Sequence, residues 1–208
     1  MRLRVRRGVT VAAPARLADF MPTADALALH TDGREHWLSV LRPGPGRLIE
    51  DRYVIDPVGA QMVDRTVFGW DAQHFIEADR RTTRDGPNLH AAPIVLPALM
   101  EHGQGAVVPA GRVSLVHHGL VQLRLGPRCW QVQAIALVGE EDGSAQVQWL
   151  ARGVGPIALG PLGAPPARWC VAFSGAVPWP EPVPDAIRAL PRSPLRAGPP
   201  GPVVRRLL

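Results

Sequence analysis

The sequence contains no lysine, and all 23 of its basic residues are arginine. The arginines are unevenly spread: nine lie in residues 2–7 and 188–208, where no acidic residue occurs. The other 14 arginines and all 18 acidic residues lie in residues 9–187, which therefore carry a formal charge of −4. A nucleic-acid-binding protein would need a basic face on its folded body, so we expect no nucleic-acid partner. Arginine-rich ends are usually solvated, although they also suit an anionic partner.

Long apolar runs are also lacking. No run approaches the ~18 residues of a membrane-spanning helix, so we expect no transmembrane segment. The arginine-rich start is followed only by GVTVAAPA, which is too short for the apolar centre of a signal peptide. On this ground the chain is expected to be cytoplasmic.

Cysteine is scarce. Cys129 and Cys170 are the two cysteines, and they lie 41 residues apart. They provide neither a disulfide framework nor the spacing of metal ligands. We interpret both as small buried hydrophobic residues.

Turn-forming residues are abundant, with 21 glycines and 23 prolines in 208 residues. Between them lie roughly ten short strand-like runs and almost no helical pattern, which predicts a single all-β antiparallel domain. The runs are residues 36–41, 47–56, 60–70, 73–82, 112–118, 120–125, 129–138, 144–151, 155–159 and 168–175. Residues 23–30 suit a short helix or a strand, and residues 83–111 resemble a loop. The domain is expected to span residues 1–177. The proline- and arginine-rich tail, 178–208, is expected to be extended or disordered, with a helix only at 184–190.

Residues 129–151 form the clearest predicted hairpin. A four-residue loop at 140–143 would place Ala134 opposite Trp149, a small residue against a large one. One face is then an apolar core that includes Trp149. The reverse face mixes glutamines with three apolar residues that we predict to line an apolar groove: Ile135, Leu137 and Leu150.

Three stretches resemble bacterial β half-barrels of the periplasmic lipoprotein-carrier type, over roughly residues 24–160. They are ALALHTDGREHWLSV (26–40), VQLRLGPRCWQV (121–132) and QVQWLARGVGPIAL (146–159). The resemblance implies a long antiparallel sheet curled around an apolar concave face, often with a helix as lid. It implies no catalytic residues, and it favours a periplasmic address over a cytoplasmic one. Gly153 and Gly155 are interpreted as a corner between two strands, where glycine permits a positive φ.

No residues are assigned to catalysis, to a cofactor or to a metal. His117 and His118 are adjacent on a strand, so they point to opposite faces, and nothing places His74 or His102 beside them. Ser114 and Ser174 lack the context of a serine hydrolase. Four acidic residues alternate with arginines, which predicts cross-strand charge pairs rather than acid–base catalysis. These are Glu50, Asp51, Asp56 and Asp64, interleaved with Arg47, Arg52 and Arg65.

The leading hypothesis is a non-catalytic β-sheet module that binds a lipid, another apolar ligand or a protein partner in a concave groove. Alternatively, the protein's own side chains, such as those of residues 92–100, fill this groove and it binds nothing. A second hypothesis is an enzyme whose site assembles from scattered histidines and acidic residues. A third is a structural protein whose arginine-rich ends contact an anionic partner.

Overall fold

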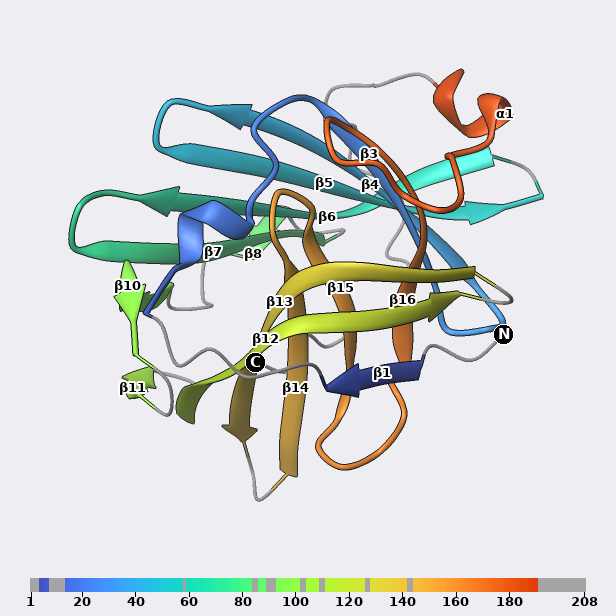
Figure 1. Cartoon of the computed structure of the whole chain (residues 1–208). Helices are drawn as coiled ribbons and strands as arrows, with labels where there is room; N and C mark the ends of the chain where they lie inside the picture. The colour runs from blue at the N-terminus through green and yellow to red at the C-terminus, as the bar shows by residue number, and fades with distance from the viewer. Residues whose placement is uncertain are drawn as a thin grey trace.

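The computed structural model describes residues 4–7, 14–57, 59–83, 86–88, 93–101, 104–108, 111–125, 128–141 and 144–190. Within these residues, fourteen strands form one antiparallel sheet and two more strands form a separate pair (Figure 1). The described helices are η1 (Leu17–Phe20) and α1 (Asp185–Arg188). The predicted mainly-β antiparallel fold is confirmed.

Two runs of consecutive strands make up the sheet. The first run is β12 (Gly111–Leu125), β13 (Arg128–Glu141), β14 (Ser144–Ala151), β15 (Gly155–Pro161) and β16 (Arg168–Ser174). The second is β3 (Ala26–Thr31), β4 (His36–Gly44), β5 (Arg47–Asp56), β6 (Gly59–Trp70), β7 (His74–Thr83) and β8 (Gly86–Asn88). β16 pairs with β3 and so joins the late strands of the chain to the early ones.

Short strands complete the structure at the edges. β1 (Arg4–Arg7) and β11 (Gly105–Val108) pair with β12, and β9 (Ile94–Pro97) pairs with β7. β2 (Ala15–Arg16) pairs with β10 (Leu99–Met100). The expectation of a loop over residues 83–111 is therefore wrong where β8 to β11 lie. These strands are short, and two of their apolar residues, Leu96 and Met100, are buried in the core.

The predicted hairpin is present, but its register is wrong by two residues. Trp149 lies opposite Ala136, not opposite Ala134. Glu141 pairs with Ser144, so only the dipeptide Asp-Gly separates the two strands. Asp-Gly is a preferred two-residue hairpin connection, and it sets the register, whereas Trp149 faces an alanine in both the predicted and the observed pairing. A shift by two leaves each side chain on its predicted face.

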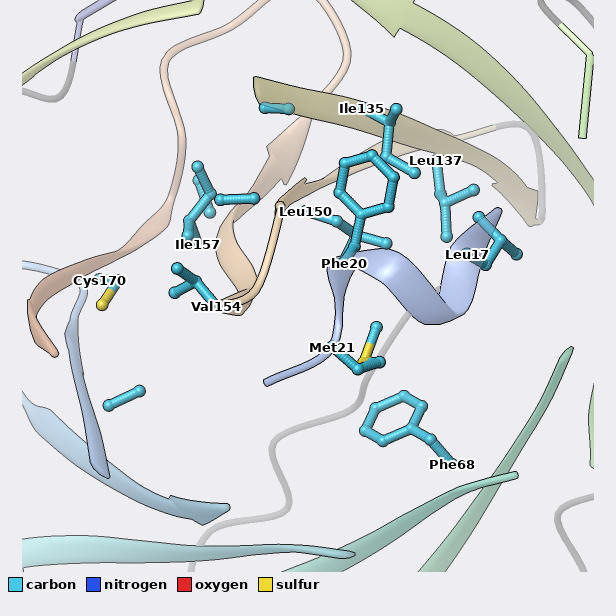
Figure 2. Close-up of a cluster of buried hydrophobic side chains, with 14 of the residues drawn as sticks. Leu17, Phe20, Met21, Phe68, Ile135, Leu137, Leu150, Val154, Ile157 and Cys170 are labelled. Atoms are coloured by element: carbon cyan, nitrogen blue, oxygen red, sulfur yellow. The ribbon is translucent and has the colours of Figure 1, made fainter. Parts of the chain in front are cut away.

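The main core lies on the face of this hairpin that was expected to be amphipathic. Ile135, Leu137 and Leu150 are 0%, 4% and 2% exposed, and they pack beside Leu17 and Phe20 of η1 (Figure 2). The opposite face carries a smaller cluster of Ala136, Val138 and Val147, against which Trp149 is only half-buried. Trp149, expected in the apolar core, packs against both clusters but is only partly buried.

The same core receives side chains from the second run of strands. Leu48 of β5, Phe68 of β6 and Phe75 of β7 belong to one cluster with Ile135 of β13. In Figure 2, Met21 follows η1 and lies between Phe20 and Phe68. We call the sheet face that carries this cluster the core face.

The C-terminal segment covers the opposite face of β3 to β5. There Leu27, Leu38 and Tyr53 form a second cluster with Val183, which is 2% exposed, and Ile187 of α1 packs against them. Within the predicted tail, residues 178–190 place apolar side chains on the sheet, and the boundary expected at residue 177 stays a prediction. α1 falls within the helix expected at 184–190, and residues 191–208 lie outside the described part of the chain.

The glycine corner before β15 is confirmed. Gly153 and Gly155 have φ values of 70° and 89°, a region that L-residues with a side chain rarely occupy. The chain continues directly as β15, so the corner is structural. The Gly153 amide also donates a hydrogen bond to the carbonyl oxygen of Asp19, 3.2 Å away, which fixes the corner to η1.

Candidate functional site

The core face changes from apolar to polar along β3, β4 and β5. On β3, Ala26 and Ala28 belong to the core, and His30 follows them on the same face. On β5, Leu48 belongs to the core and Glu50 follows. Because side chains alternate along a strand, the polar residues share the face of the core and extend it to one end of these strands.

A pocket with about 430 Å³ of empty volume, part of it open to solvent, lies at this polar end. We call it the polar pocket, and its enclosed part has room for a group of only a few atoms. It draws residues from both runs of strands. Its lining comprises His30, Trp37, Glu50, Arg52, Gln148, Pro156, Ala158, Leu159 and Arg168.

Arg52 holds the buried charges of this site together. Its guanidinium lies 3.1 Å from Glu50 Oε1 and 3.0 Å from Asp64 Oδ2. The three residues are 3–8% exposed, and Ser39 donates a 2.6 Å hydrogen bond to Glu50. Burial alone would raise the pKa of Glu50. Arg52, Ser39 and His30 outweigh it, so the pKa lies below its usual value and Glu50 is ionised at neutral pH.

His30 bridges two strands that are not neighbours in the sheet. Its Nε2 donates to the carbonyl oxygen of Pro156, 3.0 Å away on β15. β15 and β16 are paired at only two positions, Ala158 with Trp169 and Leu159 with Arg168. Burial of the imidazole lowers the pKa of His30 to about 4, so the ring is neutral at pH 7.

Arg168 lies over the ring of Trp37, with its Cζ 4.2 Å from the ring centroid. This is the geometry of a cation–π contact. Trp37 is 3% exposed, and its indole N–H has no hydrogen-bond partner within the described residues. The burial of Arg168 and its proximity to Arg52 lower its pKa, but an arginine remains charged at neutral pH.

The sequence predicted part of this arrangement. The expected cross-strand charge pairs are confirmed for Arg52 with Asp64 and for Arg65 with Asp51. Asp56 instead accepts a hydrogen bond from the Gly59 amide. Sequence reasoning missed the pocket itself. The one available signal was His30, a polar residue that follows four apolar residues in its strand.

The other candidates do not converge on the pocket. Ile135, Leu137 and Leu150 lie in the core beside η1. His74 is exposed on β7 and faces Asp71. His117 precedes a shift of register in β12, the side chains of His117, His118 and Ser114 are not described, and His102 lies outside the described residues. Ser174 ends β16 and does not line the pocket.

Across the described ranges, no group of three His, Cys, Asp or Glu side chains is placed to hold a metal ion. None of the helices in those ranges is long and apolar enough to cross a membrane. Comparisons of the chain with models of known families, with curated proteins and with solved structures find no match. The resemblance to lipoprotein carriers, and with it the half-barrel curvature, stays a prediction.

Proposed function

We propose that the protein is a non-catalytic β-sheet module that binds a small ligand with an apolar part in the polar pocket. The observation that supports this most is the convergence of Arg168, Trp37 and the buried Arg52 network on one cavity. Burying two carboxylates and a guanidinium is costly unless they are paired. A site with a few oriented polar groups beside apolar residues is typical of ligand binding.

The apolar side of the pocket is contributed by β15. Pro156, Ala158 and Leu159 line it together with the charged residues Glu50, Arg52 and Arg168. A ligand would therefore place a polar group toward Arg52 and Arg168 and an apolar group along β15. The deeper core face is already filled by the side chains of η1, β9 and β10, as Leu17, Leu96 and Met100 show.

The test is a titration with hexanol, octanol, hexanoate and octanoate, followed through the tryptophan indole NMR signals. Trp37→Phe identifies the signal of Trp37. We expect saturable shifts of this signal with at least one compound. Leu159→Trp should block the pocket and abolish the shifts, whereas Leu162→Trp, at an exposed position just after β15, should leave them unchanged. If no compound shifts the Trp37 signal, the proposal is wrong.

A second candidate site for an acyl chain is the core beneath η1. The supporting observation is that one short 3-10 turn covers Ile135, Leu137 and Leu150, and that an exposed 2.9 Å ion pair links its Asp19 to Arg152. A chain would have to displace Phe20. A fluorescent fatty acid should then bind saturably, compete with unlabelled lipid and bind more tightly to Phe20→Ala. An affinity for the fatty acid that is the same in Phe20→Ala and in the natural protein would refute this site.

A further inference from the structure

Among the residues that the structure describes, none accepts a hydrogen bond from the guanidinium of Arg168. Its contact with another described side chain is the stacking on Trp37, and no hydrogen bond or ion pair joins it to a described residue. Arg168 is half-buried at the pocket wall. A partly desolvated guanidinium presents five donors in a planar fork, which matches the two oxygens of a carboxylate.

Arg52, the second arginine of the pocket, already has carboxylate partners. It is engaged by both Glu50 and Asp64, so its hydrogen-bonding groups are already used by two carboxylates. Trp37 adds a further unsatisfied donor, since its buried indole N–H has no partner within the described part of the chain. Asp32, Glu50 and Asp64 favour the charged form of Arg168 from a distance, but Arg168 is the arginine of the pocket whose N–H groups remain open to the oxygens of a ligand.

We infer that the ligand is a small organic carboxylate with a single negative charge, held by Arg168, with its apolar chain against β15; this inference rests on the proposed function. A carboxylate is small enough for the enclosed part of the pocket. A phosphate dianion suits the site less, because its second charge would lie near the ionised Glu50, which repels it at low effective dielectric. The chain would follow Pro156 and Leu159.

The experiment compares four ligands that share one alkyl chain: octanoate, octanol, octylammonium and octyl phosphate. Affinities are measured by calorimetry at about pH 7.5, where octanoate is ionised. We expect octanoate to bind most tightly. Arg168→Gln should weaken octanoate about 10- to 100-fold, the effect of losing charge-assisted hydrogen bonds, and should leave octanol nearly unchanged. Arg47→Gln removes the same charge from the exposed end of β5 and should change neither affinity.

The outcomes separate the inference from the proposed function. If octanol and octanoate bind equally and Arg168→Gln affects neither, the pocket binds ligands but the carboxylate inference is wrong. Tighter binding of octyl phosphate or octylammonium also overturns it. If none of the four ligands binds, the inference fails, and the proposed function fails with it if hexanol and hexanoate also leave the Trp37 signal unchanged. Circular dichroism and thermal unfolding of Arg168→Gln establish that the variant is folded, and Arg168→Lys should recover part of the lost affinity because the charge returns without the planar fork.

Discussion

The Nε2 atom of His30 lies 3.0 Å from the carbonyl oxygen of Pro156, although the two residues are 126 positions apart in the chain. The carbonyl can only accept, so Nε2 carries the proton and Nδ1 of the neutral ring is left as an acceptor. This hydrogen bond ties β3 to β15 where β15 and β16 are no longer paired. The pocket wall therefore depends on the Nε2–H group of His30.

Stability should fall as the pH is lowered through the titration of His30. The folded-state pKa is about 4, below the ordinary value of 6.5. Between these values the unfolded chain binds a proton that the folded protein does not, so unfolding becomes more favourable as the pH falls. The full effect is about 3 kcal/mol. Urea unfolding at a series of pH values from about 4.5 to 7.5 measures most of it. Near the lower end of this range Glu50, whose folded pKa is lowered, adds to the loss because the carboxyl of the unfolded chain begins to bind a proton.

His30→Gln is the matched variant, because the glutamine amide can still donate to the Pro156 carbonyl but does not titrate. It should remove most of the slope between about pH 4.5 and 6.5. His74→Gln, at a histidine whose side chain is 49% exposed, should keep the slope of the natural protein. An unchanged slope in His30→Gln would show that His30 is not the group responsible.

Arg52→Gln should destabilise the fold by ~3 to 5 kcal/mol. The substitution leaves Glu50 and Asp64 buried without their shared partner, and an uncompensated buried charge is costly. Arg152→Gln is the control, because the ion pair of Arg152 with Asp19 is about half exposed on both sides and such pairs contribute at most ~1 kcal/mol. Chemical denaturation measures both. Similar small losses in the two variants would contradict the burial of the Arg52 network.

The strands could be predicted from the sequence because their signals are local. Alternation and turn residues define 47–56 and 144–151 without reference to the rest of the chain, and both ranges match the structure. The register of the 129–151 hairpin was also within reach, since the Asp-Gly dipeptide favours a two-residue connection. Pairing large with small side chains could not choose between the two registers, because Trp149 faces an alanine in each.

The pocket could not be predicted because it depends on pairing between distant parts of the chain. β16 pairs with β3 and places Cys170 opposite His30, and this pairing brings Arg168 to Trp37. Neither Arg168 nor Trp37 has a local pattern that marks it as a site residue. The sequence also did not predict that Phe20 fills the apolar face. Phe20 belongs to η1, a single turn that is too short to show a periodic pattern.

Phe20→Ala should cost ~3 to 5 kcal/mol of stability, and Trp149→Ala should cost less. Phe20 is 1% exposed in the main core, and emptying such an aromatic site leaves a cavity. Trp149 is half-buried beside the smaller cluster, so part of the space it leaves is filled by water, and ~1 to 3 kcal/mol is expected. Thermal and urea unfolding compare the two variants. A larger loss for Trp149→Ala would contradict this ranking.

Both cysteines should be free thiols, and Cys170 should be unreactive in the folded protein. Cys129 lies on β13 and Cys170 on β16, with β14 and β15 between them. Three strand spacings of ~4.8 Å exceed the Cα separation that a disulfide spans. Cys170 is 1% exposed, its Sγ lies 3.3 Å from the carbonyl oxygen of Ala172, and burial raises its pKa far above the usual range. Since the thiolate is the reactive form, a thiol reagent should reach it only when the structure opens.

Titration with such a reagent of unfolded protein that has not been reduced should therefore reveal two thiols. In Cys129→Ser, where Cys170 is the remaining cysteine, the native protein should react on the order of 100-fold more slowly than the unfolded protein. The reaction rate should rise with urea in step with unfolding, because opening of the core at β16 exposes the sulfur. The absence of free thiol in the unfolded natural protein would overturn the predicted strand separation, and fast labelling of native Cys129→Ser would overturn the burial of Cys170.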